Sequence, residues 1–202
     1  MSSTTAATVS SADDDPNNRI IVTEDEPVLI GRVDPSRAAP HNFGPVSCRE
    51  ETLFTAERPG HCQEDFRNEI VVDWVNFMKS KSITNILIIM ENDEFSVYEM
   101  DLKQFYEDAG LTVHHIPFSS PDSYQRTMAL IQSIDEQGGR VVTHCTGGKG
   151  RCGRVACAWL CKKWRLSPID ASQEFIDMAV KNGNYRLADV EKLKKWIGYS
   201  SC

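Results

Sequence analysis

Residues 141–154 read VVTHCTGGKGRCGR, and this stretch combines a nucleophilic residue type with the features of an anion site. Cys145 opens a glycine-rich loop, Arg151 closes it, and Cys152 follows directly. Closely spaced glycines let the backbone curl with its N–H groups pointing inward, which forms a nest for an anion. An arginine offers a planar fork of donors that matches two oxygens of a phosphate group. The stretch therefore predicts a phosphate-binding loop with a cysteine at its base.

The same surroundings predict that Cys145 is ionised at neutral pH. The N-terminus of the following helix and the charge of Arg151 both favour a thiolate, and we expect a pKa of roughly 4–7. A thiolate beneath a bound phosphate predicts attack on phosphorus and a phosphocysteine intermediate. A lone cysteine is more typical of a structural thiol, but the joint pattern of strand, His-Cys, five residues, Arg and helix is highly specific. The loop differs from a nucleotide P-loop, because neither Ser nor Thr follows Lys149.

Strands and helices alternate around this loop in the hydrophobic pattern. Apolar runs predict strands at residues 85–90, 111–116 and 140–144. Helical spacing predicts helices at about 66–80, 102–109, 128–134, 155–164, 169–180 and 187–197. The alternation predicts an α/β fold with a mainly parallel central sheet flanked by helices. Ligands of such folds gather at the carboxyl ends of the strands, which is where the loop after residue 144 lies.

The chain of 202 residues suits one globular domain with some length to spare. Residues 1–18 are rich in Ser, Thr and Asp and have no aromatic residue, which predicts a disordered tail. Prolines interrupt residues 19–60, where we expect short strands at 20–22 and 28–30 within an extension packed on the core. Residues 61–202 then form the main domain that carries the loop.

Charge and cysteine usage limit the partners and the compartment. A formal net charge of −7 argues against nucleic acid and anionic membrane surfaces as partners of the whole molecule. The longest strongly apolar run, at 86–90, is too short for a bilayer span, so we expect no stable membrane insertion. Seven cysteines without a secretory leader indicate free thiols in a reducing compartment. We expect a cytoplasmic monomer, without discriminating against the nucleus.

The segment HCTGGKGR, residues 144–151, resembles the active-site loop of the cysteine-dependent protein tyrosine and dual-specificity phosphatases. LFTAERPG (53–60) and SITNILIIMENDEFSVYEMDLKQFYEDAGLTVHHIPF (82–118) are similar to the branch that includes cyclin-dependent-kinase-associated phosphatase. The resemblance covers about residues 43–197 and implies a single dual-specificity-phosphatase-like domain, 61–202 being the phosphatase domain. It also implies that no metal or other cofactor is used.

The resemblance implies a role for each residue of the loop. In that family the cysteine attacks phosphorus, the arginine binds the phosphate, and a hydroxyl residue after the arginine helps the phosphocysteine to hydrolyse. Cys145 and Arg151 match the first two positions, while His144 and Cys152 are expected to support them. The phosphate is expected to lie on the loop itself, which consists of Thr146, Gly147, Gly148, Lys149, Gly150 and Arg151.

The general acid is less clear, because the sequence departs from the family at this point. The family has an aspartate shortly after a Pro-aliphatic pair, about thirty residues before the cysteine, whereas residues 117–122 here read PFSSPD. Asp122 is the nearest carboxylate on that loop and the first choice for the catalytic acid. The competing interpretation is that Asp122 caps the next helix. Asp93 and Glu94, after the first apolar strand, are the alternatives for the acid.

Cys152 is a second departure, because the family usually has Ser or Thr there. The loop geometry predicts that its thiol lies close to that of Cys145, so that peroxide would join the two in a reversible disulfide. The competing interpretation is that Cys152 is a poorer substitute for serine and nothing more. Arg186, further along the chain, is expected either near the site or in a structural ion pair.

Taken together, the residues predict a metal-free phosphomonoesterase that acts on phosphotyrosine and also on phosphoserine or phosphothreonine in proteins. Lys149 resembles a lysine of phosphoinositide-directed members, so a phosphoinositide or small-molecule phosphatase is an alternative. A phosphate-binding module with weak or no turnover is another, because the acid is not fixed. Sulfur or arsenate redox chemistry is suggested by Cys152, Cys157 and Cys161, although helix core explains the last two.

Overall fold

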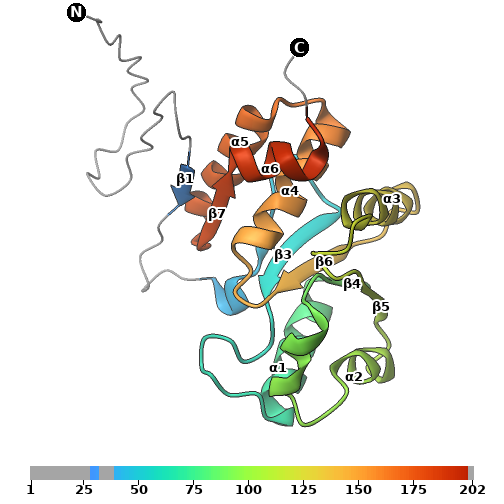
Figure 1. Cartoon of the computed structure of the whole chain (residues 1–202). Coiled ribbons are helices and arrows are strands. Elements are labelled where there is room, and N and C mark those ends of the chain that lie inside the picture. Colours follow the sequence, from blue (N-terminus) through green and yellow to red (C-terminus); the bar gives the residue numbers. More distant parts are fainter. Residues whose placement is uncertain (1–27, 32–38, 200–202) are drawn as a thin grey trace, which may run out of the picture.

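A computed structural model describes residues 28–31 and 39–199 of the chain (Figure 1). The tail predicted at 1–18 and the strand predicted at 20–22 lie outside the described residues. A strand is present where residues 28–30 predict one: β1 (Val28–Gly31) pairs antiparallel with β7 (Arg186–Asp189). The helix predicted at 187–197 consequently begins later, at Val190, because its first residues belong to β7.

The central sheet has five strands in the order β2-β3-β6-β4-β5. The strands β3, β6, β4 and β5 run parallel, and β2 pairs antiparallel at one edge. Their bounds are β2 Gly44–Pro45, β3 Leu53–Glu57, β4 Asn85–Ile88, β5 Thr112–His115 and β6 Val141–Cys145. The α/β fold with a mainly parallel sheet is therefore confirmed, and β6 occupies its middle.

Helices cover both faces of this sheet (Figure 1). The α-helices are α1 Asn68–Ser80, α2 Leu102–Asp108, α3 Ser123–Glu136, α4 Gly150–Trp164, α5 Pro168–Asn182 and α6 Val190–Ile197. Two short 3-10 helices are also present: η2 (Pro40–Asn42) precedes β2, and η3 (Asn92–Val97) lies between β4 and α2. Ser167 caps α5 by accepting from the N–H of Asp170, and proline follows at the first turn.

Two cores form because successive strand residues point to opposite faces. Leu53, Leu87 and Val141 pack with α3, α4, α5 and α6, whereas their neighbours Phe54, Ile88 and Val142 pack with α1 and α2. Both faces of β6 are buried, which explains why its sequence reads as a continuous apolar run rather than an alternating one.

The domain boundary predicted at residue 60 does not separate an extension from a core. β3 pairs with β6 from Leu53↔Val141 to Glu57↔Cys145, so it is an inner strand of the sheet. Proline spacing suggested an irregular extension, but the prolines lie outside β3 and leave its five residues free to pair. The fold of the main domain therefore begins well before residue 61.

Candidate active site

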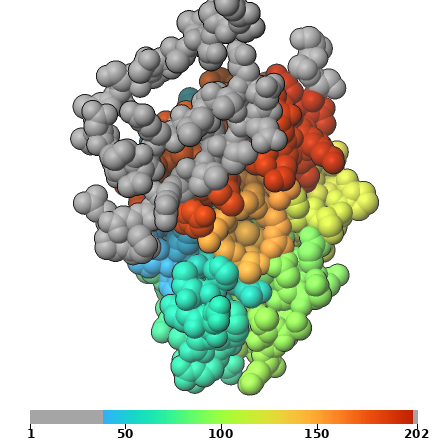
Figure 2. Space-filling model, turned by 60° about the vertical axis from the view of Figure 1, so that its left-hand side comes forward, coloured from blue at the N-terminus to red at the C-terminus, as the bar shows by residue number. Residues whose placement is uncertain are grey.

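The loop after β6 lies at the carboxyl end of the sheet, and α4 begins within it at Gly150 (Figure 1). The N-terminus of α4 therefore faces the loop and places its partial positive charge there. In Figure 2 the orange residues around position 150 reach the surface, bordered by the blue-green and green residues of the segments after β3 and β4. This placement is the one that the hydrophobic pattern predicts.

The backbone of the loop depends on glycine at position 148. Gly148 has a φ of 65°, and a Cβ atom there would lie 2.5 Å from the carbonyl carbon and oxygen of Ala56. The N–H of Arg58 binds the carbonyls of Cys145 (3.0 Å) and Thr146 (3.1 Å) from the β3 side. In a trans peptide the N–H points away from its carbonyl, so the N–H groups of residues 146 and 147 point to the other side. The sequence thus folds into a nest of donors pressed against β3.

Cys145 lies at the base of this loop with 3% of its surface exposed. A hydrogen bond from the Cys152 thiol, the charge of Arg151 and the N–H groups of Cys152 and Gly148 together outweigh burial and lower the pKa of Cys145 to about 6. Its thiol is therefore largely ionised at neutral pH. This value lies in the range that the sequence predicts.

The Cys152 thiol is the direct neighbour of this thiolate. Its Sγ lies 3.5 Å from the Sγ of Cys145, and it is fully buried. Burial and the neighbouring sulfur raise the pKa of Cys152 well above its usual value, so Cys152 keeps its proton and donates it in a hydrogen bond. The proximity of the two thiols that the sequence predicts is thus present.

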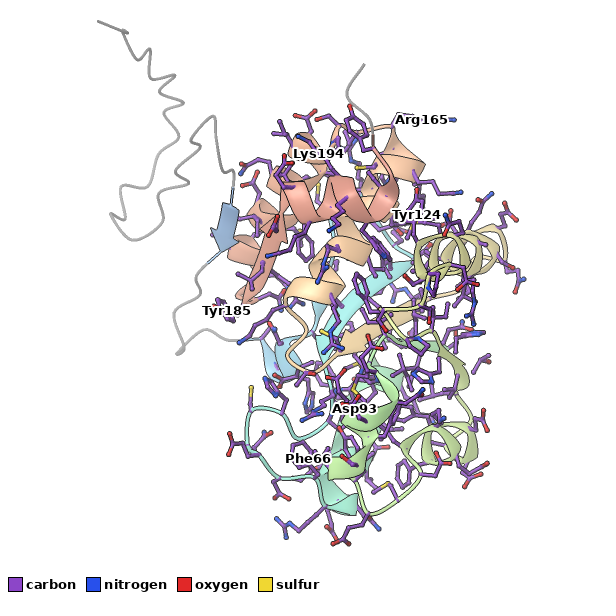
Figure 3. The ribbon with its side chains drawn as sticks, viewed as in Figure 1. Phe66, Asp93, Tyr124, Arg165, Tyr185 and Lys194 are labelled. Carbon is purple, nitrogen blue, oxygen red and sulfur yellow. The ribbon has the colours of Figure 1, made fainter. Side chains whose placement is uncertain are left out.

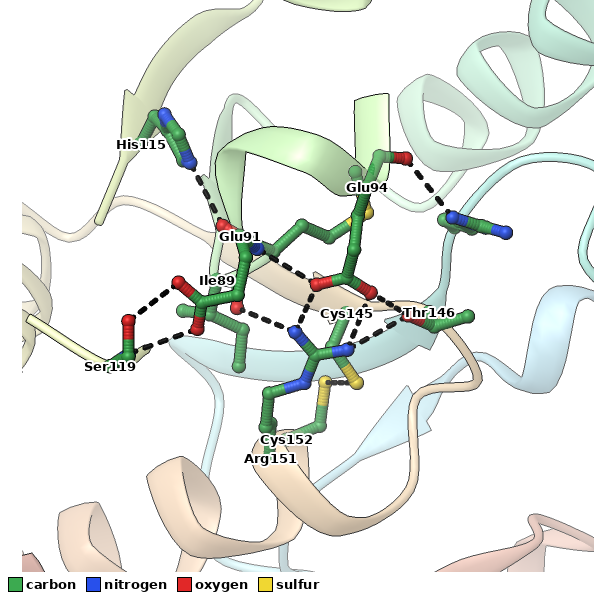
Figure 4. A network of polar contacts seen from close by, with 11 residues as sticks. Ile89, Glu91, Glu94, His115, Ser119, Cys145, Thr146, Arg151 and Cys152 are labelled. Atoms are coloured by element: carbon green, nitrogen blue, oxygen red, sulfur yellow. Dashed lines mark hydrogen bonds and ion pairs between the residues drawn. The ribbon is translucent and has the colours of Figure 1, made fainter. Parts of the chain in front are cut away.

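Arg151 forms an ion pair with Glu94, as Figure 4 shows. Its Nη1 donates to Oε2 of Glu94, its Nη2 donates to Oε1 at 2.7 Å, and Nη2 also donates to Oγ1 of Thr146 at 2.8 Å. Burial opposes ionisation of Glu94, but hydrogen bonds from Arg151 and Thr146 and from the N–H of Glu91 prevail and lower its pKa to about 2. Glu94 is one of the two alternatives for the acid, and it is the one that contacts the loop.

Asp122 occupies a different environment from the one expected of a general acid. It holds the N-cap position of α3, yet its carboxylate makes no capping hydrogen bond there. The side chain is 60% exposed and lies 3.6 Å from Arg126, and among the described residues no hydrogen bond or ion pair joins it to the loop. Neither interpretation of Asp122, acid or side-chain cap, finds a matching contact, and its catalytic role stays a prediction.

The segment that carries Asp122 is held instead by Glu91. The carboxylate of Glu91 accepts from the N–H of Ser119 at 3.0 Å and from its hydroxyl at 2.7 Å. Glu91 is also the N-cap of η3, where it and Glu94 form a reciprocal capping box. Asp93, the other alternative for the acid, is exposed on the same short helix (Figure 3).

His144 supports the loop from the opposite face of β6. Its ring lies edge-on to Trp74 and Tyr106 with centroid distances of 5.4 and 5.9 Å, and Nε2 is 3.4 Å from the Tyr106 hydroxyl. Burial lowers the pKa of His144 to about 3, so the ring is neutral. Because strand side chains alternate, His144 and Cys145 point to different cores, and His144 orients the strand rather than touching the phosphate site.

Arg186 is a positive charge near the site that sequence reasoning placed only loosely. It is fully buried and donates to the carbonyls of Asn42 (2.6 Å), Thr55 (3.1 Å) and Tyr185 (3.2 Å). No carboxylate pairs with it among the described residues, so the predicted structural ion pair is not found. Burial lowers the pKa of Arg186 to about 10, and the neighbouring sulfurs of Cys152 and Cys145 oppose this shift, so Arg186 remains charged near them.

Three cations on the loop and on the segments next to it each lie against an aromatic ring. Lys149 lies with its Nζ 4.1 Å from the ring centre of Tyr185, Arg58 lies over Phe66 at 5.0 Å, and Arg154 lies over Phe118 at 4.4 Å. Figure 3 shows Phe66 and Tyr185 on different segments of the chain. Such pairs hold the cations in place while keeping their charge.

Within residues 28–31 and 39–199, no group of three or more His, Cys, Asp or Glu side chains is arranged to hold a metal ion. Over the same described part of the chain, no helix has the length and apolar character needed to cross a bilayer.

The chain is similar in sequence to a described phosphatase family. A family described as "Polymorphic toxin system, DSP-PTPase phosphatase" matches residues 62–164, just over half of the chain. The Mus musculus protein "Cyclin-dependent kinase inhibitor 3" is 26% identical over 165 residues, which are 75% of this chain and 77% of the mouse protein.

Solved structures have the same fold at lower sequence identity. Kinase associated phosphatase, with its catalytic cysteine changed to serine, is 22% identical and has a TM-score of 0.61 over 89% of this chain and 99% of its own. Tk-PTP in its active form gives 21% identity and 0.53 over 75% and 95%. PTPMT1 in complex with PI(5)P gives 12% identity and 0.56 over 76% and 93%. These likenesses confirm the predicted fold class.

Proposed function

The chain belongs to the DSP-PTPase phosphatase family described for polymorphic toxin systems, and we propose that it removes phosphate from phosphotyrosine in proteins, with Cys145 as the nucleophile and Arg151 as the group that binds the phosphate. The family makes the chain a cysteine-dependent phosphatase, so the proposal concerns the residues and the substrate. The observation that carries it is the Cys145 thiolate, with a pKa of about 6, at the base of a glycine-rich nest. A thiolate held in an anion site is the arrangement that phosphoryl transfer to sulfur requires.

In the proposed reaction the phosphate lies in the nest, bound by loop N–H groups and the guanidinium of Arg151. The sulfur of Cys145 attacks phosphorus while the bond to the substrate oxygen breaks, and that oxygen leaves with a proton. Water then attacks the phosphocysteine, which releases inorganic phosphate and restores the thiolate. No oxidant or reductant enters either step.

The three pairs of a cation and an aromatic ring favour a phosphotyrosine substrate. Phe66, Phe118 and Tyr185 each lie against a cation on segments around the loop, so a substrate ring would meet both aromatic edges and positive charge. The relatives named as a kinase inhibitor and a kinase associated phosphatase are consistent with a protein substrate. The PI(5)P complex of PTPMT1 and the position of Lys149 keep a phosphoinositide as the second candidate.

We further propose that the protein acts in the cytoplasm as a monomer, with no nucleic acid partner. Free thiols support a reducing compartment, and six described cysteines are free: Cys48, Cys62, Cys145, Cys152, Cys157 and Cys161. The net charge of −7 disfavours polyanions as partners outside the local positive region at the loop.

A substrate panel tests this assignment. We expect kcat/KM for phosphotyrosyl peptides to exceed that for phosphothreonyl peptides and for PI(5)P by about fivefold, because one aromatic contact contributes about 1 kcal/mol. Phosphate release would be measured in excess chelator, and inhibition by vanadate in a separate assay without chelator. Faster turnover of PI(5)P than of every peptide would replace the protein substrate by a phosphoinositide.

Peroxide is expected to inactivate the enzyme reversibly through a disulfide between Cys145 and Cys152. Hydrogen peroxide oxidises the Cys145 thiolate to a sulfenic acid, and the Cys152 thiol 3.5 Å away displaces water to form the bond. Dithiothreitol should restore activity, and mass spectrometry of the oxidised protein should find the linked peptides.

The matched control for this redox prediction is Cys152→Ser. This variant cannot form the bond, so peroxide should drive Cys145 to sulfinic acid and the activity loss should resist dithiothreitol. A sulfinic acid on Cys145 in the wild type, or a bridge from Cys145 to Cys62 or Cys157, would show that the two neighbouring thiols do not protect each other.

A further inference from the structure

The carboxylate of Glu94 occupies one donor edge of the Arg151 guanidinium (Figure 4). Both terminal nitrogens of the guanidinium donate to Glu94, one to each carboxylate oxygen. The same parallel pair of N–H donors can bind two oxygens of a phosphate. Arg151 cannot present this edge to Glu94 and to a substrate at the same time, so a phosphate that binds this edge releases the carboxylate.

Glu94 is held at the loop by more than Arg151. Its Oε1 accepts from the hydroxyl of Thr146, the first residue after the nucleophile, and its Oε2 accepts from the N–H of Glu91 at 2.8 Å. The carbonyl of Glu94 also accepts from Nη1 of Arg58 at 3.2 Å, on the segment that holds the loop from the β3 side. The side chain is 21% exposed, so the carboxylate is sheltered yet open toward the site.

Arrival of a phosphate changes the charge balance around Glu94. In the free protein the positive charge of Arg151 stabilises the carboxylate, which also accepts from the hydroxyl of Thr146 and the N–H of Glu91. The other charged groups that contact residue 94 bind its backbone: the guanidinium of Arg58 donates to its carbonyl, and the carboxylate of Glu91 accepts from its N–H. A phosphate dianion on Arg151 removes that stabilisation and adds two negative charges nearby. Like charges in a sheltered site favour protonation of one of them, so Glu94 takes up a proton from solvent.

We propose that Glu94 is the general acid of this phosphatase, loaded with its proton when the phosphate displaces it from Arg151. The proposal rests on the cysteine-dependent reaction above. Glu94 gives this proton to the substrate oxygen as sulfur attacks and the phosphorus–oxygen bond breaks, which leaves an alcohol, phosphocysteine and a carboxylate. The carboxylate then takes a proton from the attacking water, which yields inorganic phosphate, the Cys145 thiolate and protonated Glu94.

A return of Glu94 to Arg151 completes this cycle. Once phosphate leaves, the protonated carboxyl releases its proton to solvent and binds the guanidinium again. The carboxylate thus competes with phosphate for Arg151, which favours product release. Asp122 offers no such route, because its carboxylate faces Arg126 rather than the loop.

Leaving-group dependence in Glu94→Gln tests the proposal. Glutamine has the shape of glutamate but does not supply the proton, and a general acid contributes about 10²–10⁴-fold. We expect kcat for phenyl phosphate, a poor leaving group, to fall by about this factor, and kcat for 4-nitrophenyl phosphate to fall by less than about tenfold. Vanadate should bind the variant as tightly as the wild type or more tightly, because a competing negative charge is gone.

The pH profile gives a second measure of the same role. The acid must be protonated to donate, so kcat of the wild type for phenyl phosphate should fall as pH rises above the pKa of Glu94 in the substrate complex. Glu94→Gln should lack this fall. Glu99→Gln, an exposed change just beyond η3, is the matched control and should keep the wild-type ratio of the two substrates.

Three outcomes would overturn the proposal. Equal slowing of both substrates with weaker vanadate binding would make Glu94 a positioning residue for Arg151. Leaving-group dependence in Asp122→Asn but not in Glu94→Gln would return the role to Asp122. An unchanged ratio in both variants would place the acid elsewhere. A wild-type protein that hydrolyses neither substrate would instead refute the proposed function, so the two failures are distinguishable.

Discussion

Cys145→Ser is expected to lower kcat by about 10⁴–10⁶-fold while the protein still binds phosphotyrosyl peptides, since loss of a nucleophile has effects of this size in other covalent enzymes. A serine hydroxyl stays protonated at neutral pH, whereas the Cys145 thiol has a pKa of about 6. Residue 145 is buried among groups that the change leaves in place, so fold and anion binding should persist. Steady-state kinetics and calorimetric peptide binding measure the two effects.

Cys161→Ser is the matched control for this variant. Cys161 lies near the end of α4, and burial raises the pKa of its thiol to about 11, so it is not a thiolate at neutral pH. Its replacement should leave kcat near the wild-type value. Turnover in Cys145→Ser comparable to that of the wild type, or activity that requires a divalent metal, would contradict nucleophilic catalysis by Cys145.

Arg151→Ala is expected to lose both turnover and phosphate binding, with kcat/KM lower by about 10³-fold or more. The change removes the fork that holds two phosphate oxygens and one of the groups that lower the pKa of Cys145. It also leaves the Glu94 carboxylate without its cation, so the pKa of Glu94 should rise from about 2. Vanadate inhibition and the pH dependence of Cys145 alkylation would report the loss of binding and the higher pKa of the thiol.

Arg151→Lys separates the charge of Arg151 from its geometry, and Arg126→Ala is the control. Arg151→Lys keeps one positive charge but not the planar fork, so it should recover part of the low pKa of Cys145 and little of the phosphate affinity. Arg126→Ala, an exposed arginine on α3, should change neither measurement. Phosphate binding in Arg151→Ala equal to that of the wild type would show that the loop N–H groups alone hold the substrate.

Arg151 and Glu94 contact each other, so a double variant tests whether their effects on anion binding are coupled. Glu94 holds both terminal nitrogens of Arg151 in the free protein, so under the proposal above the arginine exchanges one anion for another when substrate binds. In the double variant Arg151→Ala, Glu94→Gln the two effects should not add, because the residues contact each other. Vanadate affinity across the four proteins would measure this coupling.

The chemistry of the loop could be predicted from sequence because every part of it is local. The strand β6, the nest and the first turn of α4 are consecutive in the chain, so Cys145 and Arg151 meet whatever the rest of the fold does. Even the contact between Cys145 and Cys152 follows from the loop, since Cys152 lies in the first turn of α4, directly after the nest. Hydrophobic periodicity likewise indicated the parallel sheet, because buried strands and amphipathic helices have different repeats.

Only the tertiary structure decided which distant groups face this loop. Glu94 is 57 positions before Arg151, and the pair forms because β4 and β6 are neighbours that end at the same edge of the sheet. Arg186 reaches the two sulfurs because β7 packs on α4, and β3 is an inner strand because it pairs with β6. Asp122 is the nearest carboxylate in sequence on the loop that carries the family's acid, yet its side chain lies against Arg126 on α3. Sequence spacing determines contacts within a turn or two, whereas contacts between elements depend on strand order and packing, which no local pattern encodes.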